Sequence, residues 1–338
     1  MPQESLYSLL EQTLKTLDTE SCEYRPANTF TGLPGGLLDF CSEQKRLPTL
    51  VVPDLHARLD FFNKVMEYKL QVLDSDFDGS ATIFELLKSG NIRIVCLGDG
   101  LHSELHKERW LAAYNEFEKG IITGNNMHQE MQDGLLLMEQ IFSCKCKFPE
   151  FFHFLKGNHE NILNSNRGGN HSFRKFVQEG EMVRLFMMEY YGQELLHLYA
   201  SVEEALPLCA ICPNCILSHA EPERAYSREE LIDGLFDSQV IHGLTWTNNG
   251  DSQEGSVKRM LDLLQPNFPE ALYLGGHRPV SGKYALRQQN KFVQIHNPRM
   301  QNVAIVLHNR AFNPETDIIS LDEKKRTSYN DIHGGENG

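Results

Sequence analysis

Five short apolar runs in this chain each end in side chains that can bind a metal ion or transfer a proton. The runs are rich in Val, Ile, Leu and Phe, and their length predicts β-strands rather than helices. In an open α/β sheet, binding sites lie at the carboxyl ends of the strands. The runs and the residues that follow them are "TLVV" (49–52) with Asp54 and His56, "IRIVCL" (92–97) with Asp99, "FFHFL" (151–155) with Asn158 and His159, "CILS" (215–218) with His219, and "ALYL" (271–274) with His277.

These side chains, with His159 set aside, form a donor set suited to two metal ions. Oxygen and imidazole donors without a thiolate favour Mn, Fe or Zn over copper or an iron–sulfur cluster. Six protein ligands are awkward around one ion but natural around two ions that share a bridging carboxylate. Such pairs of ions activate water for in-line attack at phosphorus. The set comprises Asp54, His56, Asp99, Asn158, His219 and His277.

The elements that must position these residues alternate between strands and helices. Further apolar runs at 239–244, 292–295 and 303–307 predict additional strands. The alternation predicts an α/β layered domain, with mixed β-sheets flanked by helices. From residue 271 onward the strands follow one another closely, which predicts antiparallel hairpins. Patterns of helical periodicity predict helices within 59–73, 104–119, 127–142 and 171–191.

Composition and charge exclude several classes of function. The 338 residues are 41% hydrophobic and 23% charged, as in an ordinary globular protein. The net charge of −14 argues against nucleic-acid binding, which needs clustered Lys and Arg. No apolar run is long enough to cross a bilayer, and the N-terminal segment has acidic residues among its leucines and no basic region. We therefore expect a cytoplasmic protein that binds neither nucleic acid nor a membrane.

The motifs, in their order along the chain, resemble those of the calcineurin-like metallophosphoesterases, and most of all the Ser/Thr-phosphatase branch. The resemblance covers about residues 48–320. It implies a layered metallophosphoesterase sandwich that hydrolyses phosphomonoesters, phosphoproteins among them, by attack of a metal-bound hydroxide. The motifs that carry it are Asp54-x-His56, Gly98-Asp99, Gly157-Asn158-His159-Glu160, His219, Gly276-His277 and the Trp-containing loop "GLTWTNN" (243–249).

The resemblance also implies a role for each residue. Asp54 and His56 would bind the first metal, and Asp99 would bridge the two ions. The second metal would be bound by Asn158, His219 and His277. His159 would be the general acid that protonates the leaving alkoxide. Pro279 stands where many members of the superfamily have a further histidine, as in the Ser/Thr-phosphatase branch.

The chain departs from the family at its second motif, which reads "GDGLHSE" (98–104). His102 replaces the Asp that orients the catalytic histidine, and Ser103 replaces an Arg that binds phosphate. Arg58, Arg278 or Arg167 could supply that phosphate contact. Two alternatives therefore stay open: a phosphodiesterase or dinucleoside-polyphosphate hydrolase, and a weakly active metal-binding scaffold.

The resemblance divides the chain into three parts. Residues 1–47 are expected to form an N-terminal helical extension, 48–321 the catalytic domain, and 322–338 a disordered tail.

Two further motifs allow more than one interpretation. "DSDFDGSATIFE" (74–85) has the spacing of a calcium-binding loop. Against calcium, the sequence has no second such loop to pair with it and has Ala81 at the eighth position, and the alternative is an acidic turn between a helix and a strand. Cys209-x2-Cys212-x2-Cys215 suggests zinc, yet no fourth ligand is evident. The same stretch reads as two strands joined by a Pro-Asn turn, with thiols buried inside.

Overall fold

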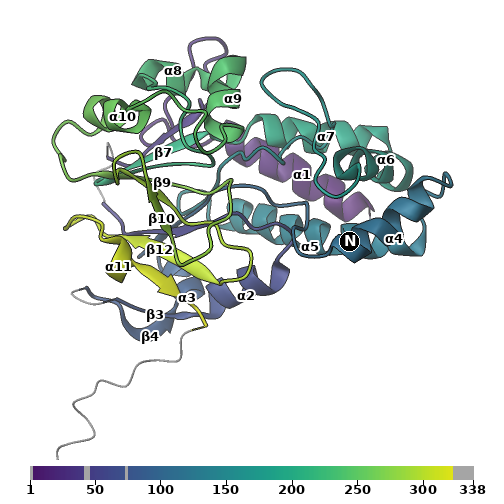
Figure 1. The fold of residues 1–338 in the computed structure, drawn as a ribbon, viewed down its shortest axis with the longest axis horizontal. Helices are drawn as coiled ribbons and strands as arrows, with labels where there is room; N and C mark the ends of the chain where they lie inside the picture. Colours follow the sequence, from purple (N-terminus) through teal and green to yellow (C-terminus); the bar gives the residue numbers. More distant parts are fainter. Residues whose placement is uncertain (1–2, 42–45, 73–74, 323–338) are drawn as a thin grey trace, which may run out of the picture.

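Two β-sheets form the centre of the computed structural model, which describes residues 3–41, 46–72 and 75–322 (Figure 1). The five-stranded sheet has the order β13-β12-β2-β5-β6. Its strands are β2 (Thr49–Val52), β5 (Arg93–Cys96), β6 (Phe152–Phe154), β12 (Asn302–Val306) and β13 (Ile318–Ser320). The six-stranded sheet has the order β1-β7-β8-β9-β11-β10. Its strands are β1 (Leu37–Asp39), β7 (Cys209–Cys212), β8 (Cys215–Ser218), β9 (Leu272–Gly275), β10 (Ala285–Arg287) and β11 (Phe292–Gln294).

Each sheet contains three neighbouring strands that run parallel. In the first sheet β2 pairs with β5 and β5 with β6, and in the second β8 pairs with β9 and β9 with β11. Parallel neighbours bring their carboxyl ends to one edge. β12, by contrast, is antiparallel to β2. Six loops that carry polar residues therefore leave the two sheets, one from each parallel strand.

The two sheets pack face to face between layers of helices. Because side chains alternate along a strand, Val51 faces the other sheet while Leu50 and Val52 face the helices. One outer face carries α1 (Gln3–Asp18), α2 (Leu59–Glu67), α3 (Ile83–Lys88), α4 (Lys107–Phe117), α5 (Asn125–Lys147), α6 (Glu179–Tyr191) and α7 (Gln193–Glu204). The other carries α8 (Arg228–Ile232), α9 (Ser238–Thr245) and α10 (Ser256–Leu264) (Figure 1). Short elements complete the fold: the hairpin β3 (Lys69–Gln71) and β4 (Asp78–Thr82), the 3-10 turn Gly234–Phe236, and α11 (Pro314–Asp317). The predicted layered α/β class is confirmed.

One predicted strand is wrong, because "QVIHGL" (239–244) lies in the helix α9. The Asp237 side chain accepts a hydrogen bond from the Gln239 backbone N–H and starts the helix. Val240, Ile241 and Leu244 then lie on one buried face. A short apolar run is compatible with the periodicity of a strand and with that of a helix, so the Asp237 cap is the feature that distinguishes the two. The predicted helix 59–73 also ends early, at Glu67, where β3 follows.

The N-terminal segment packs into the main core. Leu6, Leu10 and Leu17 of α1 are buried, and α1 packs on α5 and α7. β1 adds a strand parallel to β7. The three-part division of the chain stays a prediction, and residues 323–338 of the predicted tail lie outside the described residues. Within the part of the chain that the structure describes, no helix is long and apolar enough to span a membrane.

A buried cluster of charged groups fixes the segment after α1 against β6. Lys145 of α5 donates to the Glu20 carboxylate and to the carbonyl of Phe152. Arg25 also donates to Glu20. The Nδ1 atom of His153, on β6, lies 3.3 Å from both Lys145 Nζ and the Glu20 carboxylate. All four side chains, Glu20, Arg25, Lys145 and His153, are buried, so each charge depends on its partners.

Candidate metal centre

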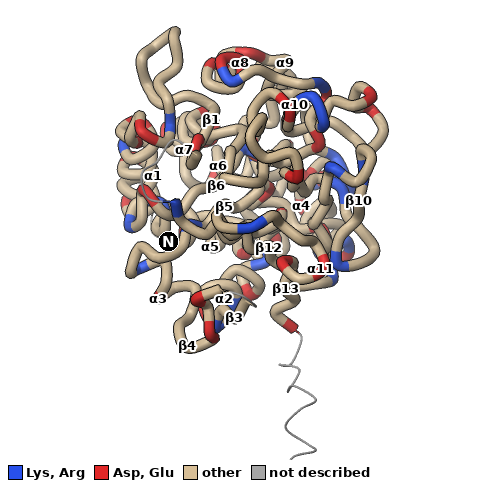
Figure 2. The backbone as a smooth tube through the Cα atoms, turned by 90° about the vertical axis from the view of Figure 1, so that its left-hand side faces the viewer, with Lys and Arg blue, Asp and Glu red and all other residues tan. Residues whose placement is uncertain are grey.

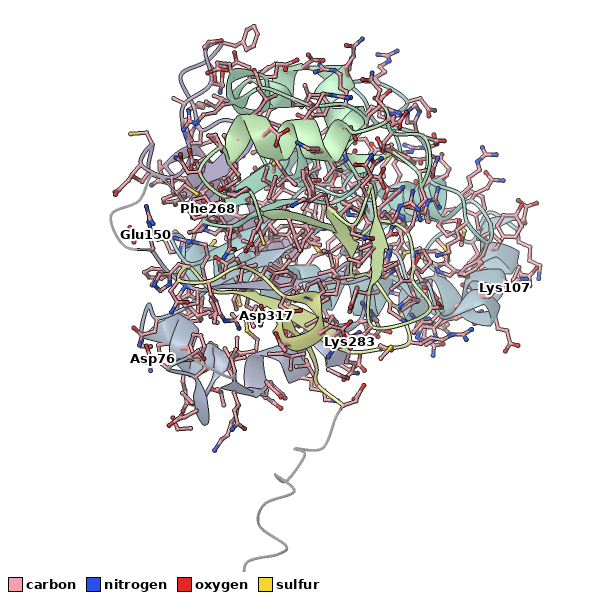
Figure 3. The ribbon with its side chains drawn as sticks, turned by 60° about the vertical axis from the view of Figure 1, so that its left-hand side comes forward. Asp76, Lys107, Glu150, Phe268, Lys283 and Asp317 are labelled. Carbon is pink, nitrogen blue, oxygen red and sulfur yellow. The ribbon has the colours of Figure 1, made fainter. Side chains whose placement is uncertain are left out.

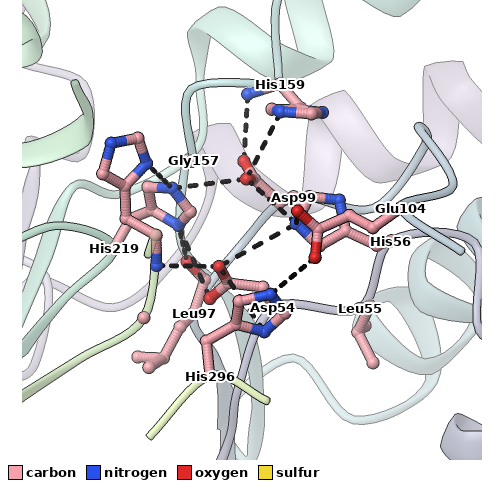
Figure 4. A network of polar contacts seen from close by, with 12 residues as sticks. Asp54, Leu55, His56, Leu97, Asp99, Glu104, Gly157, His159, His219 and His296 are labelled. Carbon is pink, nitrogen blue, oxygen red and sulfur yellow. Dashed lines mark hydrogen bonds and ion pairs between the residues drawn. The ribbon is translucent and has the colours of Figure 1, made fainter. Parts of the chain in front are cut away.

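The six predicted metal ligands meet where the loops leave the parallel strands. Figure 4 labels four of them, Asp54, His56, Asp99 and His219. Asp54 follows β2, Asp99 follows β5 and Asn158 follows β6, all from one sheet. His219 follows β8 and His277 follows β9 of the other sheet. His56 lies two residues beyond Asp54 and is buried like its neighbours. The two sheets therefore contribute to one site at their common edge.

The donors form two groups that share Asp99. In one group, His56 Nε2 lies 4.0 Å from Asp54 Oδ2 and 3.6 Å from Asp99 Oδ2. In the other, His219 Nε2 lies 3.4 Å from Asp99 Oδ2. Asn158 Oδ1 is 2.9 Å from His219 Nε2 and 3.0 Å from His277 Nδ1. A single carboxylate oxygen thus faces both groups, as a bridging ligand must.

Hydrogen bonds leave the imidazoles ready to bind cations. His56 donates through Nδ1 to the His102 carbonyl, and His219 donates through Nδ1 to the Leu97 carbonyl, both at 2.9 Å. Each ring therefore presents an unprotonated Nε2 to the centre. His56 Nε2 and Asp54 Oδ1 are buried and have no hydrogen-bond partner among the described residues. Buried polar atoms are costly without a partner, and a divalent cation would supply one. These residues fit two metal ions.

The electrostatics agree with that fit. Burial, together with the charges of Glu160 and Asp54, raises the pKa of Asp99 well above its usual value. Burial lowers the pKa of His56 to about 4 and that of His277 well below its usual range. The imidazoles are therefore neutral, the form that binds metal, while the carboxylates repel one another. Bound cations would relieve this repulsion.

Tight backbone geometry holds the ligands in place. Asp99 has φ 54°, His56 φ 45° and His277 φ 62°, in the left-handed region that side chains other than glycine rarely adopt. Such strain persists only where the surroundings enforce it. A Cβ atom added at Gly276 would lie 1.8 Å from Asp54 Oδ1, and one at Gly157 would lie 2.2 Å from Asp99 Oδ1. The glycines of these motifs are therefore needed for the ligands to fit.

His159 lies against the centre but is not oriented by His102 through a hydrogen bond. Its backbone N–H donates to Asp99 Oδ1 at 2.9 Å, and its ring packs on Phe173 with 3.7 Å between centroids. The His102 ring lies edge-on, 4.9 Å away. Neither His102 nitrogen, nor Nδ1 of His159, has a hydrogen-bond partner within the described part of the chain. Burial lowers the pKa of both rings, that of His102 to about 3.

A cavity of about 200 Å³ opens over His159 and the metal ligands. Trp246, in the loop expected near the site, lines it, as do Arg278 and two cations that sequence reasoning missed, Arg174 and Lys175. A larger cavity, of about 720 Å³, contains none of the six ligands, so the smaller one is the candidate site.

Of the three arginines proposed for phosphate binding, Arg58 and Arg167 do not line the candidate cavity. Arg58 donates to the backbone carbonyls of Asp54, Leu55 and Asn297, which ties it to the loop. Arg167 lines the larger cavity instead. On the side drawn in Figure 2, segments of Lys and Arg are scattered among segments of Asp and Glu.

Sequence reasoning missed two acceptors beside the first group. His296 follows β11 and is fully buried, with its ring 5.2 Å from that of His56. Glu104, at the end of "GDGLHSE", turns its carboxylate into the site, with Oε1 3.6 Å from His56 Nε2. The apolar run 292–295 before His296 carried the same strand-end pattern as the other five.

The acidic stretch 74–85 is preceded by a strand rather than the expected helix. β4, which lies within this stretch, pairs antiparallel with β3, and Asp76 lies exposed at the periphery of the molecule (Figure 3). The Glu85 carboxylate accepts hydrogen bonds from the Thr82 N–H and hydroxyl in a capping box. Asp74 lies outside the described residues. Calcium binding at this stretch stays a prediction.

The cysteine motif forms a hairpin. β7 and β8 pair antiparallel, with Cys212 opposite Cys215 and Cys209 opposite Ser218. All three cysteines are buried. In the described ranges, no group of side chains placed to hold a metal includes them. The interpretation as two strands joined by a turn is confirmed.

Comparison with known proteins agrees with this architecture. No family model and no curated protein matches the chain. Among solved structures, a Saccharomyces cerevisiae protein serine/threonine phosphatase, with similarity to human phosphatase PP5, matches with a TM-score of 0.57 at 13% identity over 95% of this chain and 89% of its own. A cold-active protein-tyrosine phosphatase of a psychrophilic Shewanella species matches with a TM-score of 0.44 at 13% identity, over 85% of this chain and 82% of its own.

The chain thus shares the fold of the Saccharomyces cerevisiae protein serine/threonine phosphatase. The predicted resemblance is confirmed at the level of the fold.

Proposed function

We propose that this protein is a metal-dependent phosphomonoesterase with a dinuclear centre. The observation that supports it most is the position of Asp99 Oδ2, 3.6 Å from His56 Nε2 and 3.4 Å from His219 Nε2. A carboxylate so placed can serve two ions at once. Asp54 and His56 would hold the first ion, and Asn158, His219 and His277 the second, with Mn, Fe or Zn as the metal.

The chain's own residues would perform the remaining tasks. Bound metal ions supply Lewis acidity, which activates water and neutralises charge on a phosphoryl group. His159, at the floor of the cavity, would donate a proton to the leaving oxygen. Lys175 and Arg278 line the same cavity and would attract the phosphate oxygens. Trp246 and Phe173 line its wall and limit access of water.

The small volume of the cavity, about 200 Å³, favours a phosphomonoester, whose phosphoryl group fits while the alcohol points outward. A phosphate group on a small molecule or on a protein side chain meets this requirement. A cytoplasmic location of this activity is part of the proposal.

Metal analysis combined with a substrate panel tests the proposal. Purified protein should bind two Mn or Zn ions per chain and hydrolyse an aryl phosphomonoester faster than the matching diester. Asp99→Asn should weaken the binding of both ions, whereas His277→Ala should mainly abolish the binding of the second ion. Glu204→Gln, at an exposed position, serves as the control. Two bound ions without turnover would favour the scaffold, and faster diester hydrolysis would favour a phosphodiesterase.

A further inference from the structure

His296 lies beside the first group of donors with one nitrogen free. The residue is 0% exposed, and its Nδ1 lies 3.9 Å from Asp54 Oδ2. Its ring stands 5.2 Å from that of His56, so both imidazoles face the same carboxylate (Figure 4). Asp54, His56 and His296 together have ligand atoms close enough to surround one cation.

The Glu104 carboxylate determines which nitrogen of His296 carries the proton. Glu104 Oε2 lies 2.7 Å from His296 Nε2. An ionised carboxylate only accepts, so Nε2 must donate and Nδ1 keeps its lone pair. Lys175 forms an ion pair with Oε1 of the same carboxylate, which favours its ionised form. The free nitrogen therefore points at the metal ligands.

A purely structural role leaves this geometry unexplained. Nδ1 of His296 has no hydrogen-bond partner among the residues that the structure describes. A buried acceptor without a partner is costly, so a core histidine would normally satisfy both nitrogens. His56 and His219 show the same arrangement: one nitrogen donates to an oxygen and the other faces the carboxylates. His296 shares the geometry of the ligands.

We propose that His296 binds the first metal through Nδ1 and that Glu104 is the positioning residue that holds its ring. The first ion would then have Asp54, His56, Asp99 and His296 around it. A carboxylate that accepts the second N–H of a ligating histidine fixes the tautomer and raises the basicity of the ligand. The inference rests on the proposed function, because it assumes a metal at this position.

Metal content, measured without reference to turnover, tests the assignment. Wild-type protein and variants would be loaded with Mn²⁺, dialysed against a competing chelator, and assayed by elemental analysis and by the paramagnetic resonance signal of a coupled Mn pair. His296→Ala should retain about one ion per chain and lose the pair signal. Glu104→Gln should retain both ions with affinity for the first lowered about 10- to 100-fold.

Controls separate ligation from folding. His308→Ala removes an exposed histidine and should behave as wild type. His296→Gln keeps more of the side-chain volume, and should lose the first ion even if His296→Ala folds poorly. Free imidazole should restore part of the metal content of His296→Ala. Asp54→Asn combined with His296→Ala should lose no more ions than either variant alone.

Each outcome decides between the assignments. Two ions of unchanged affinity in both His296 variants would overturn the inference and leave the proposed function intact. Loss of the first ion in Glu104→Gln but not in the His296 variants would also overturn it, and make Glu104 the direct ligand. Wild-type protein with two ions and no turnover would overturn the proposed activity alone. Wild-type protein that binds no metal would overturn both.

Discussion

The Glu160 carboxylate accepts a hydrogen bond from the backbone N–H of Asp99, with 2.8 Å between Oε2 and N. The same carboxylate accepts the N–H of Gly100 at 2.9 Å and that of Gly157 at 2.7 Å. It therefore joins the loop after β5 to the loop after β6. The strained backbone of Asp99, with φ 54°, is held by this clamp, which makes Glu160 a support of the bridging ligand.

Glu160→Gln should loosen the clamp. A glutamine presents one acceptor oxygen, and its NH2 group would face a backbone N–H, so at least one buried donor loses its partner. We expect the metal-free protein to lose about 1–3 kcal/mol of unfolding free energy, and the affinity for both ions to fall. Urea unfolding and metal titration measure the two effects, with Glu204→Gln as the exposed control. Unchanged stability and affinity would show that the clamp is dispensable.

Gly276→Ala should displace a metal ligand without touching any donor atom. The added Cβ would lie 1.8 Å from Asp54 Oδ1, so Asp54 must move. We expect loss of the first ion and of activity. Gly282→Ala is the matched control, because its nearest neighbour would be 3.9 Å away. Retention of both ions in the Gly276 variant would mean that the loop can shift without cost.

His102→Asp should strengthen His159 as a proton donor. His102 makes no hydrogen bond to His159 in the described structure, whereas a carboxylate beside that imidazole would favour its charged form. We expect turnover of phosphomonoesters with poor leaving groups to rise by about tenfold and that of activated aryl esters to change little. His106→Asp adds the same charge at an exposed position. If turnover of both substrates changed equally, residue 102 would not influence proton donation by His159.

His153 should make the metal-free protein sensitive to acid. Burial, with the nearby Lys145 charge, lowers the pKa of His153 to about 3, whereas an unfolded histidine titrates near about 6.5. As the pH falls below the pKa of His153 in the unfolded chain, the unfolded chain binds a proton at this residue and the folded chain does not. The stability present above about pH 6.5 is therefore lost toward acid, by about 1.4 kcal/mol per pH unit from this group.

The variant His153→Gln isolates this effect, because other buried histidines contribute equally to both proteins. The unfolding free energy of wild type minus that of the variant should shrink between about pH 6 and about pH 4. Denaturant unfolding at a series of pH values measures it. A difference that stays constant with pH would show that His153 does not titrate in this range.

The positions of the strand ends could be predicted from the sequence, because at each of them a polar residue follows a buried apolar run. The direction of each strand within its sheet could not be predicted. Both "FVQI" (292–295) and "VAIVL" (303–307) are followed at once by a histidine, His296 and His308. β11 runs parallel to β9, so His296 reaches the site. β12 runs antiparallel to β2, and its end points to the opposite edge. The strand pairing places His296 and His308 at opposite edges of the sheets, and this pairing is decided by the tertiary fold.

The cations of the cavity were missed for a related reason. Arg174 and Lys175 lie in the stretch 171–191 that was predicted to be helical, but α6 begins only at Glu179. The irregular segment before α6 brings both cations to the cavity. Arg58, by contrast, looked suitable because it follows the first motif. The Arg58 guanidinium instead donates to the Leu55 and Asp54 carbonyls of its own loop, because the local turn places them within reach.

The pairing of β1 with β7 also governs how the protein can be made. β1 ends at Asp39, and its partner ends at Cys212, so a ribosome that adds about 5–20 residues per second needs roughly 10–35 seconds to supply the partner. α1 gains its partner α5 sooner, once Lys147 has been made, but it waits about as long as β1 for α7, the other helix that packs on it. β2 waits longer still, for β12. The strand β1 of the nascent chain thus cannot pair until the chain has reached Cys212, well past its midpoint.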